Sequence, residues 1–352
     1  MPVDWIVCEE GGDFEYISSA GAVAQAGDRI LVCPGTFSSI WNLAPGVTVE
    51  STGGSAVTFL TGAGEGWGEG DPCVEVVEDG VSIRGFTCIG YDVEVPCYPG
   101  TADSASPVGA IITGEDALLE DFVVFRGPDS SEFGVGVSLE SAHGAILRDL
   151  NLEDAGVAIS DTDDFTVERL ECRLLSPQES CHVTTHQSTG TVRNARGLGP
   201  GPVEFCADWD AGSARGVALY DGSEVWVDNI TVSSMPGGVC RASIRCEDST
   251  LHVRNSILAN NAGYGIYTEN CTVDAEYNLA YGNAMGDFNI EGVTTPGPTD
   301  LNVDPLFTDP DNGDVTLAPG SPAIDAGDPD PAYNDLDGTR NDMGYTGGPT
   351  GW

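Results

Sequence analysis

The feature that most constrains the fold is a segment that repeats itself further along the chain, with residue 253 aligned on residue 276. Residues 253–260 read Val-Arg-Asn-Ser-Ile-Leu-Ala-Asn, and residues 276–283 read Glu-Tyr-Asn-Leu-Ala-Tyr-Gly-Asn. The same alignment superimposes residues that favour bends, Asn255 on Asn278, Asn260 on Asn283 and Gly263 on Gly286. A period of about 20–50 residues is typical of solenoids, and runs of Val, Ile and Thr without helical periodicity predict one turn of a parallel β-helix.

A four-residue phrase, apolar–polar–bend–apolar, marks the successive turns. It recurs eight times, and its last apolar place is loose. The phrases begin at Val49, Ile83, Leu119, Leu147, Val167, Val192, Val227 and Val253. Their uneven spacing predicts turns of about 20–26 residues, some of which carry insertions.

The polar place of this phrase alternates in charge along the chain. Its members are Glu50, Arg84, Glu120, Arg148, Glu168, Arg193, Asp228 and Arg254. If successive phrases form neighbouring parallel strands about 4.8 Å apart, every charge lies between two opposite charges. Each exposed pair would contribute only about 0.2–1 kcal/mol, but a slipped turn would stack like charges, so we interpret the column as a register device. Chance alternation is the other interpretation.

The 11 cysteines indicate an oxidising compartment, because so many free thiols rarely persist outside metal sites. Separations near one turn predict three disulfides, Cys8–Cys33, Cys73–Cys97 and Cys246–Cys271, since one turn up the stack brings Cα atoms to about 5 Å. Further candidate pairs are Cys172–Cys181 and Cys206–Cys240, and the odd count leaves one thiol, Cys88, unpaired. No CxxC pair occurs, which argues against a zinc site.

The charge balance is strongly acidic, with 56 acidic residues against 13 basic ones, a formal net charge of −43 and no lysine. Such a surface repels nucleic acid and anionic lipid, and it suits divalent cations or a salty medium. General solubility without any site is the alternative explanation. No apolar run approaches the length of a membrane span. The first residues lack a basic region followed by an apolar stretch, so we expect no signal peptide in this chain.

The N-terminal region resembles the start of secreted right-handed β-helix proteins of the pectin-lyase-like class. Residues 27–37, Gly-Asp-Arg-Ile-Leu-Val-Cys-Pro-Gly-Thr-Phe, match their Gly-Asp-x-Ile-x-Val-x-Pro-Gly-Thr-aromatic strand. The opening matches less well, since Tyr16 stands where those proteins have Thr, and the following small-residue segment is richer in Gly and Ser. The resemblance implies an all-β fold, a single-stranded right-handed parallel β-helix whose short N-terminal helix covers the first turn.

The C-terminal region breaks the period and contains the phrase Ser-Pro-Ala-Ile-Asp-Ala-Gly-Asp at residues 321–328. It resembles the C-terminal segment of bacterial surface β-helix proteins, in which this phrase closes the last coil. We therefore divide the chain into a cap with the first strand (1–37), coils (38–290) and a closing segment with Asp-rich loops (291–352). In total we expect about ten turns.

Calcium is the cofactor that the closing segment favours. Several acidic residues cluster around a glycine-containing loop, which would supply the hard oxygen ligands that Ca²⁺ requires. The candidate ligands are Asp325, Asp328, Asp335, Asp337 and Asp342. The spacing is not that of an EF-hand. The alternative is a set of Asx turns whose side chains bond their own backbone.

Two long intervals between phrases, 83–119 and 192–227, predict loops that wall a groove on one flank of the coil. We expect carbohydrate contacts from Tyr91 and from Trp209 with its neighbours Asp208 and Asp210, a carboxylate pair beside a ring that can stack on sugar. A lyase would instead need a base and a cation, and Arg196 and Arg215 flank the second loop. These two arginines, Asp208 and Asp210 are the candidate catalytic residues.

Two other patterns are less specific. His143-Gly144 and the cluster Asp161, Asp163 and Asp164 suggest a polygalacturonase-type hydrolase, but their order is reversed and the cluster also fits a polar turn. His182 and His186 lie on one face of an extended segment, where they could bind a metal or form an exposed structural pair.

The interpretation that these patterns favour is a secreted or cell-surface module that binds a polysaccharide or surface glycan, or calcium, without catalysis. The alternatives are a calcium-dependent polysaccharide lyase or glycoside hydrolase acting on acidic polysaccharide, and a structural stalk or adhesin segment, because one fold hosts all three. We expect a monomer.

Overall fold

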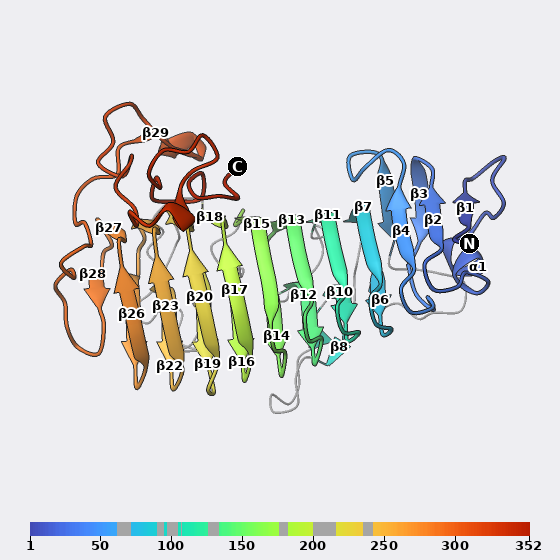
Figure 1. Ribbon diagram of the computed structural model, residues 1–352, viewed down its shortest axis with the longest axis horizontal. Coiled ribbons are helices and arrows are strands. Elements are labelled where there is room, and N and C mark those ends of the chain that lie inside the picture. Colours follow the sequence, from blue (N-terminus) through green and yellow to red (C-terminus); the bar gives the residue numbers. More distant parts are fainter. Residues whose placement is uncertain are drawn as a thin grey trace. The chain divides into compact units, whose positions relative to one another are not determined.

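A computed structural model of the protein describes residues 1–61, 72–89, 95–96, 105–106, 108–125, 134–175, 182–199, 216–234 and 242–352 (Figure 1). The chain divides into two compact units, Met1–Thr166 and Val167–Trp352, and each is described by itself. Within the ranges given, no helix has the length and apolar character needed to cross a membrane.

The first unit is built almost entirely of short strands. Its α-helix α1 (Ile17–Gly21) lies where the sequence predicts a helix, and it buries Ile17 and Ala20. The strands are β1 (Asp4–Val7), β2 (Arg29–Val32), β3 (Gly35–Ser38), β4 (Thr48–Ser51), β5 (Thr58–Thr61), β6 (Val74–Val76), β7 (Ser82–Ile89), β8 (Val95–Pro96), β9 (Ala105–Ser106), β10 (Val108–Ile112), β11 (Leu118–Phe125), β12 (Gly134–Glu140), β13 (Ile146–Glu153) and β14 (Ala155–Ser160).

The second unit continues the same pattern. The strand β15 (Phe165–Arg173) crosses the boundary between the units, with residues 167–173 in the second one. The following strands are β16 (Val183–His186), β17 (Thr189–Arg193), β18 (Arg196–Leu198), β19 (Val217–Tyr220), β20 (Glu224–Asp228), β21 (Thr231–Ser233), β22 (Ala242–Glu247), β23 (Thr250–Arg254), β24 (Ile257–Ala259), β25 (Tyr264–Glu269), β26 (Thr272–Glu276), β27 (Leu279–Tyr281), β28 (Gly286–Asn289), β29 (Phe307–Asp309) and β30 (Asp314–Leu317), with the 3₁₀ turns η1 (Pro310–Asn312) and η2 (Pro331–Tyr333).

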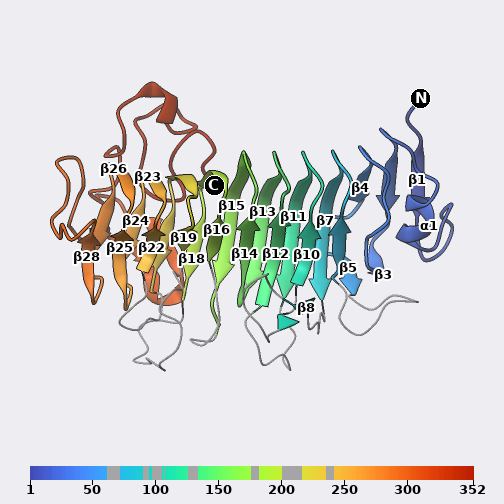
Figure 2. The same cartoon turned by 90° about the horizontal axis from the view of Figure 1, so that it is seen from below.

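In both units, each turn of the chain adds one strand to each of several parallel sheets. The first unit stacks β1–β2–β4–β7–β11–β13 and β6–β10–β12–β14. The second unit stacks β17–β20–β23–β26, β18–β21–β24–β27 and β16–β19–β22–β25–β28 (Figures 1 and 2). Inward residues such as Val192, Val227 and Val253 are fully buried. The predicted parallel β-helix is confirmed.

The alternating charges lie in register within each unit, as predicted. In the first unit Glu120 is paired with Arg84 and Arg148, and its carboxylate oxygens lie 3.2 and 3.5 Å from their guanidinium nitrogens. In the second unit Arg193 is paired with Asp228, and Asp228 with Arg254. The column therefore sets opposite charges on neighbouring strands.

The third place of the phrase bends the chain through the left-handed region. The residues there with positive φ include Gly85, Asp121, Asp149, Asn194, Asn229 and Asn255. Glycine, asparagine and aspartate adopt this conformation at low cost, so the bend favours these residue types. A similar bend at the same place in each turn keeps the strands stacked.

The repeat predicted from the sequence is one residue too long. Arg254 pairs with Glu276 and Ile257 with Leu279, whereas the predicted alignment sets Arg254 against Tyr277. A slip of one residue would turn every inward side chain outward, so burial decides the register. The bend at Asn255 is repeated by Tyr277, at φ 54° and 56°, which shows that backbone conformation recurs although the residue type does not. The corrected register adds Glu276 to the charge column.

Two of the predicted disulfides are confirmed, Cys8–Cys33 and Cys246–Cys271. The predictions for Cys73 and Cys88 are wrong, because these residues bond to each other, with Cα atoms 5.8 Å apart. Both are fully buried, so the bond spans the interior of the coil. A sequence separation of one turn identifies only cysteines on stacked strands. It does not identify cysteines that face each other across the interior of the coil. Cys172 is disulfide-bonded, and Cys97, Cys181, Cys206 and Cys240 lie outside the described residues.

The C-terminal segment lies along the side of the second unit (Figure 1). Ala323 and Met343 pack on Ile257, Ala259 and Leu279, which belong to successive turns. The asparagines at the bends hold the segment by hydrogen bonds. The Nδ2 of Asn194 donates to the carbonyls of Tyr345 and Gly347, that of Asn229 donates to the carbonyls of Asp342 and Gly344, and the Oδ1 of Asn255 accepts from the amide of Asp328.

Candidate functional site

The predicted carbohydrate-contact residues and the candidate catalytic Arg215 belong to segments that the structure does not describe. Tyr91, Asp208, Trp209, Asp210 and Arg215 lie outside the described residues. A candidate site is therefore built from the side chains that the structure describes.

Arg196 anchors the C-terminal residues. Its guanidinium donates to Glu171 at 2.6 Å and to the Tyr345 hydroxyl at 3.2 Å. It also lies over the rings of Tyr345 and Trp352, with its central carbon 5.1 and 5.3 Å from the ring centroids. These contacts hold the guanidinium against the C-terminal residues, so the arginine has a structural role here.

The acidic loops of the C-terminal segment are organised by backbone amides. The Asp335 carboxylate accepts from the amides of Asp342 and Gly348, at 3.0 and 2.6 Å. Asp342 accepts from the amide of Asp325 at 2.7 Å. Burial raises the pKa of both Asp335 and Asp342. Each of these carboxyl groups is thus partly desolvated and close to the other.

The remaining predicted ligands have other partners. Asp337 accepts from the Thr339 hydroxyl and amide, which lowers its pKa. Asp328 accepts from Arg254 at 3.0 Å and from the amide of Asp330 at 2.9 Å. Among the described side chains, no three of His, Cys, Asp or Glu form a group suited to a metal. Calcium binding stays a prediction.

His143 and His186, which belong to the two less specific patterns, make local contacts. The Nδ1 of His143 lies 3.0 Å from the amide of Asp163, within a polar turn of the first unit. His186 stacks on Tyr220 with ring centroids 5.1 Å apart, and its Nδ1 lies 2.8 Å from Asp221. Neither contact assembles a hydrolase site.

An aromatic pair with one exposed ring, which the prediction from the sequence missed, marks the outer face of β17, β20, β23 and β26. We call this the Trp226 face. Strand pairing places four side chains in one outward row: Thr191, Trp226, His252 and Asp274. Val225 and Val227 on either side of Trp226 are fully buried, whereas Trp226 is 41% exposed. Alternation along the strand thus forces the indole outward.

The two rings of this row form a flat stack. Trp226 and His252 have centroids 4.6 Å apart and planes 5° from parallel. The His252 ring is flanked on both sides, since its Nε2 lies 3.3 Å from Glu224 and its Nδ1 lies 3.7 Å from Asp274. These contacts fix the orientation of His252, and His252 in turn supports one face of the indole.

The charged side chains around the stack are paired within the protein. Asp274 accepts from Arg254 at 3.1 Å, and Arg193 lies 3.4 Å from Glu168, which is only 2% exposed. Asp228 is flanked by Arg193 and Arg254 in the charge column. Burial raises the pKa of Asp228 to about 6, and the two arginines oppose that rise. The face therefore combines a bare aromatic ring with compensated charges and hydroxyl groups.

The signal for this site was present in the sequence. Trp226 and His252 each precede a member of the charge column, Asp228 and Arg254, by two positions, so the column alignment already placed them in one outward row. The buried valines on either side place this ring outside the core, so packing of the coil interior does not require it.

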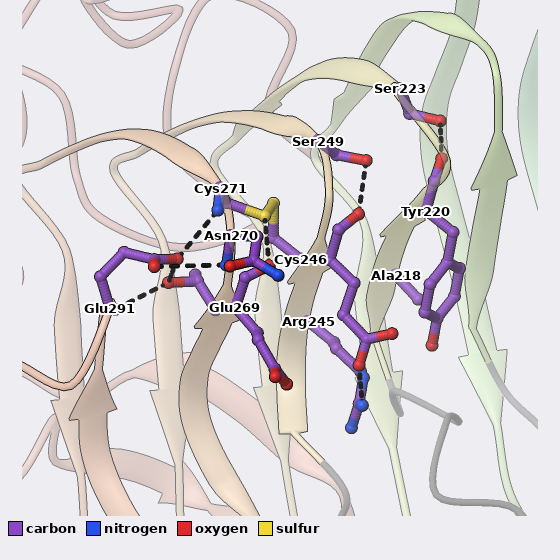
Figure 3. Close-up of a disulfide and its surroundings, with 12 residues drawn as sticks. Ala218, Tyr220, Ser223, Arg245, Cys246, Ser249, Glu269, Asn270, Cys271 and Glu291 are labelled. Carbon is purple, nitrogen blue, oxygen red and sulfur yellow. Dashed lines mark hydrogen bonds and ion pairs between the residues drawn. A yellow bond between two sulfur atoms is a disulfide. The ribbon is translucent and has the colours of Figure 1, made fainter.

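A second cluster lies on the outer face of β16, β19, β22, β25 and β28, which we call the arginine–tyrosine face. Arg245 contacts Glu247 and lies over the Tyr267 ring at 5.4 Å. The Tyr267 hydroxyl is 3.4 Å from Glu269, and its ring is 5.4 Å from that of Tyr264. Figure 3 shows Tyr220, Arg245 and Glu269 on this side of the strands, next to the Cys246–Cys271 disulfide.

The middle of the arginine–tyrosine face is not open to solvent. Arg245 is 8% exposed and Ala218, paired with it at an outward position, is 1% exposed. Nearer β28, the rings of Tyr264 and Tyr267 and the Glu269 carboxylate are at least partly accessible. A small cavity inside the coil, lined by residues such as Leu170, Val192 and Ile230, has room for about one water molecule and none for a sugar.

No protein-family model matches the chain, and no curated protein matches it. Among solved structures the chain is similar to pectate lyase Pel9A, with 13% identity, a TM-score of 0.45 and coverage of 98% of this chain and 96% of that one. It is also similar to carrot pectin methylesterase (11% identity, TM-score 0.44, 71% and 82% covered) and to the A-module of the mannuronan C-5 epimerase AlgE4 of Azotobacter vinelandii (13%, 0.40, 76% and 86%). Likenesses at this level do not assign a reaction or a ligand to this chain.

Proposed function

We propose that the protein is an extracellular or cell-surface β-helix module that binds a polysaccharide on the Trp226 face. One observation carries this proposal: an indole that is 41% exposed stands stacked on His252 in the middle of a flat, polar, multi-strand face. An exposed ring of this kind binds the apolar face of a sugar, and the surrounding hydroxyl and carboxylate groups bind its hydroxyls.

Two further properties support this function. The face is built on strands, so its side chains are held by the register of a rigid coil rather than by a loop. The disulfides Cys8–Cys33, Cys73–Cys88 and Cys246–Cys271 suit an oxidising environment, where extracellular glycans are found. Charged groups on this face are paired with one another, as Asp274 is with Arg254, while the indole stays exposed, and the proposal is for binding.

Affinity electrophoresis of the whole protein in gels containing individual polysaccharides tests this function. We expect the parent protein to be retarded by at least one glycan and Trp226→Ala to lose about tenfold or more in affinity, as for a central aromatic contact. Tyr16→Ala is the matched control, because Tyr16 is a comparably exposed ring, at 48%, in the first unit. Equal retardation of the parent and Trp226→Ala would overturn the proposal.

The second candidate function is cleavage of a polysaccharide at the arginine–tyrosine face. It is favoured by Glu247 and Glu269, which occupy directly paired positions on β22 and β25. Two neighbouring carboxyl groups are the usual acid and base of glycoside hydrolysis. Release of reducing ends that Glu269→Gln abolishes, with no change in melting temperature, would establish it. No release by the parent protein from the glycans that it binds would exclude it for those glycans.

We also propose that Ca²⁺ binds the loop around Asp335 and Asp342, whose carboxyl groups are partly buried and repel one another. A cation there would stabilise the folded protein by about 2–3 kcal/mol at a concentration near 100 times its Kd. We expect millimolar-range Ca²⁺, but not Mg²⁺, to raise the melting temperature, and Asp342→Asn to remove the increase. A melting temperature that is the same in Ca²⁺ and in chelator would contradict this proposal.

A further inference from the structure

We infer that the ligand of the Trp226 face is an uncharged polysaccharide, one sugar ring of which sits over Thr191 against the free side of the indole. This inference rests on the proposed function and adds to it the seat of the sugar and the class of the glycan. It is carried by the order of side chains in the outward row and by the ion pairs of the two arginines beside that row.

The row leaves one side of the indole open. His252 covers the side toward β23, at 4.6 Å. On the opposite side, toward β17, the paired residue is Thr191, whose side chain is too short to cover an indole. The 41% exposure of Trp226 agrees with one covered and one open side.

The open position has the size of one stacked ring. Neighbouring strands lie about 4.8 Å apart, close to the ring separation found in stacked aromatic contacts. The spacing of Trp226 and His252, 4.6 Å, shows that rings on adjacent strands of this face stack at this distance. A ring placed one strand beyond Trp226 therefore lies over Thr191 and continues the stack. A pyranose ring, with its apolar C–H side toward the indole, fits this position.

The polar group beneath the seat is suited to hydroxyls. Thr191 lies there on β17. A threonine hydroxyl both donates and accepts, so it can bind a hydroxyl of a neutral sugar in either role. The Glu224 carboxylate is directed toward His252, on the covered side of the indole.

The charges around the seat disfavour an acidic sugar. Arg193, the arginine nearest along β17, is paired with the buried Glu168. Arg254 is held by Asp274 and Asp328, at 3.1 and 3.0 Å. A uronate carboxylate would compete with these partners for the guanidinium groups, and it would approach a chain with a formal net charge of −43. An uncharged glycan neither competes for the arginines nor is repelled by the net negative charge.

A ring built into the protein at position 191 tests the seat. Thr191→Phe should fill the open position, leave the fold intact and lower the affinity for the glycan about tenfold or more. Thr272→Phe is the matched control, because Thr272 is an exposed outward threonine on β26, away from the open side of the indole. Trp226→Phe keeps a smaller aromatic ring at position 226 and should bind the glycan more weakly than the parent protein but more tightly than Trp226→Ala, so it separates loss of the ring from loss of folding. Circular dichroism and melting temperatures are recorded for all variants.

The class of glycan is tested by titrating the protein with β-glucan, xylan and galactomannan, and with pectate and alginate, at low and high salt. We expect binding to a neutral glycan that does not change with ionic strength. Binding only to the acidic glycans, weakening with salt, would overturn the inference and leave the proposed function intact. The same conclusion would follow if a folded Thr191→Phe bound the glycan fully while Trp226→Ala did not bind it. Binding to none of the glycans would overturn the proposed function itself.

Discussion

The Trp226 face and the arginine–tyrosine face belong to the same turns of the second unit but use their outward positions in opposite ways. On the Trp226 face, charges pair between neighbouring strands, as Arg254 does with Asp274, and the Trp226 ring on the next strand, β20, stays exposed. On the arginine–tyrosine face, Arg245 pairs along its own strand with Glu247 and is buried. Equivalent backbone thus supports an accessible ring on one side and a sequestered cation on the other. Backbone geometry alone does not decide where a ligand binds.

The largest expected effect on stability comes from the buried cation. Arg245→Ala removes a side chain that is only 8% exposed, together with its contacts to Glu247 and to the Tyr267 ring, so we expect the free energy of unfolding to fall by about 2–4 kcal/mol. Arg173→Ala is the control, since Arg173 is exposed and lies 3.5 Å from Glu171 at the end of β15. We expect its effect to stay within about 0.5 kcal/mol. Chemical denaturation measures both, and equal effects would contradict the contrast between the two faces.

A pH-dependent contribution of intermediate size is expected from Asp228 on the Trp226 side. Burial raises its pKa to about 6 from an ordinary value of 3.8, so the folded state binds this proton more tightly than the unfolded state. Its contribution to stability is fully present below about pH 4 and is lost as the pH rises through 6, by an amount on the order of 2–3 kcal/mol. Relative to Asp228→Asn, the parent protein should therefore gain stability as the pH falls from 7 to 4. A stability difference between the two that is constant over this range would contradict the assigned pKa.

The smallest expected effect tests the corrected register. Glu276 pairs with Arg254, and their charged atoms lie 3.6 Å apart at a partly exposed position. Glu276→Arg would place like charges side by side and lower the free energy of unfolding by about 0.5–1 kcal/mol, an effect that salt should reduce. Glu276→Gln is the neutral control and should have a smaller effect. If the alignment predicted from the sequence held, Tyr277 would face Arg254 and the reversal would have no such salt dependence.

Much of the architecture could be predicted from the sequence because it depends on patterns that repeat locally. Bends at Asn194, Asn229 and Asn255 and the alternating charges beside them indicated both the coil and its stacking. The one-residue error in the repeat arose because Asn255 was aligned with Asn278, whereas the bend at Asn255 recurs at Tyr277. The bond between Cys73 and Cys88 was missed because the prediction considered only vertical neighbours.

The candidate site was much less predictable. The prediction from the sequence placed the site in the long intervals, around Trp209 and Tyr91, which lie outside the described residues. It passed over Trp226, although alternation with Val225 and Val227 already directed this ring outward. What alternation could not reveal is that His252 would support one side of the indole and Thr191 would leave the other open, since that requires knowing which strands are neighbours.

The order of residues along the chain was enough to establish a stacked coil with alternating charges, because turns of similar length and composition can bury their apolar residues together in few other ways. Only the folded molecule decided the exact partner of each residue, the path of the C-terminal segment over Asn194, Asn229 and Asn255, and the open side of Trp226. Those features depend on contacts between residues that are distant in sequence, from one turn apart to the reach of Asn194 to Gly347 and Trp352, and no local pattern records them.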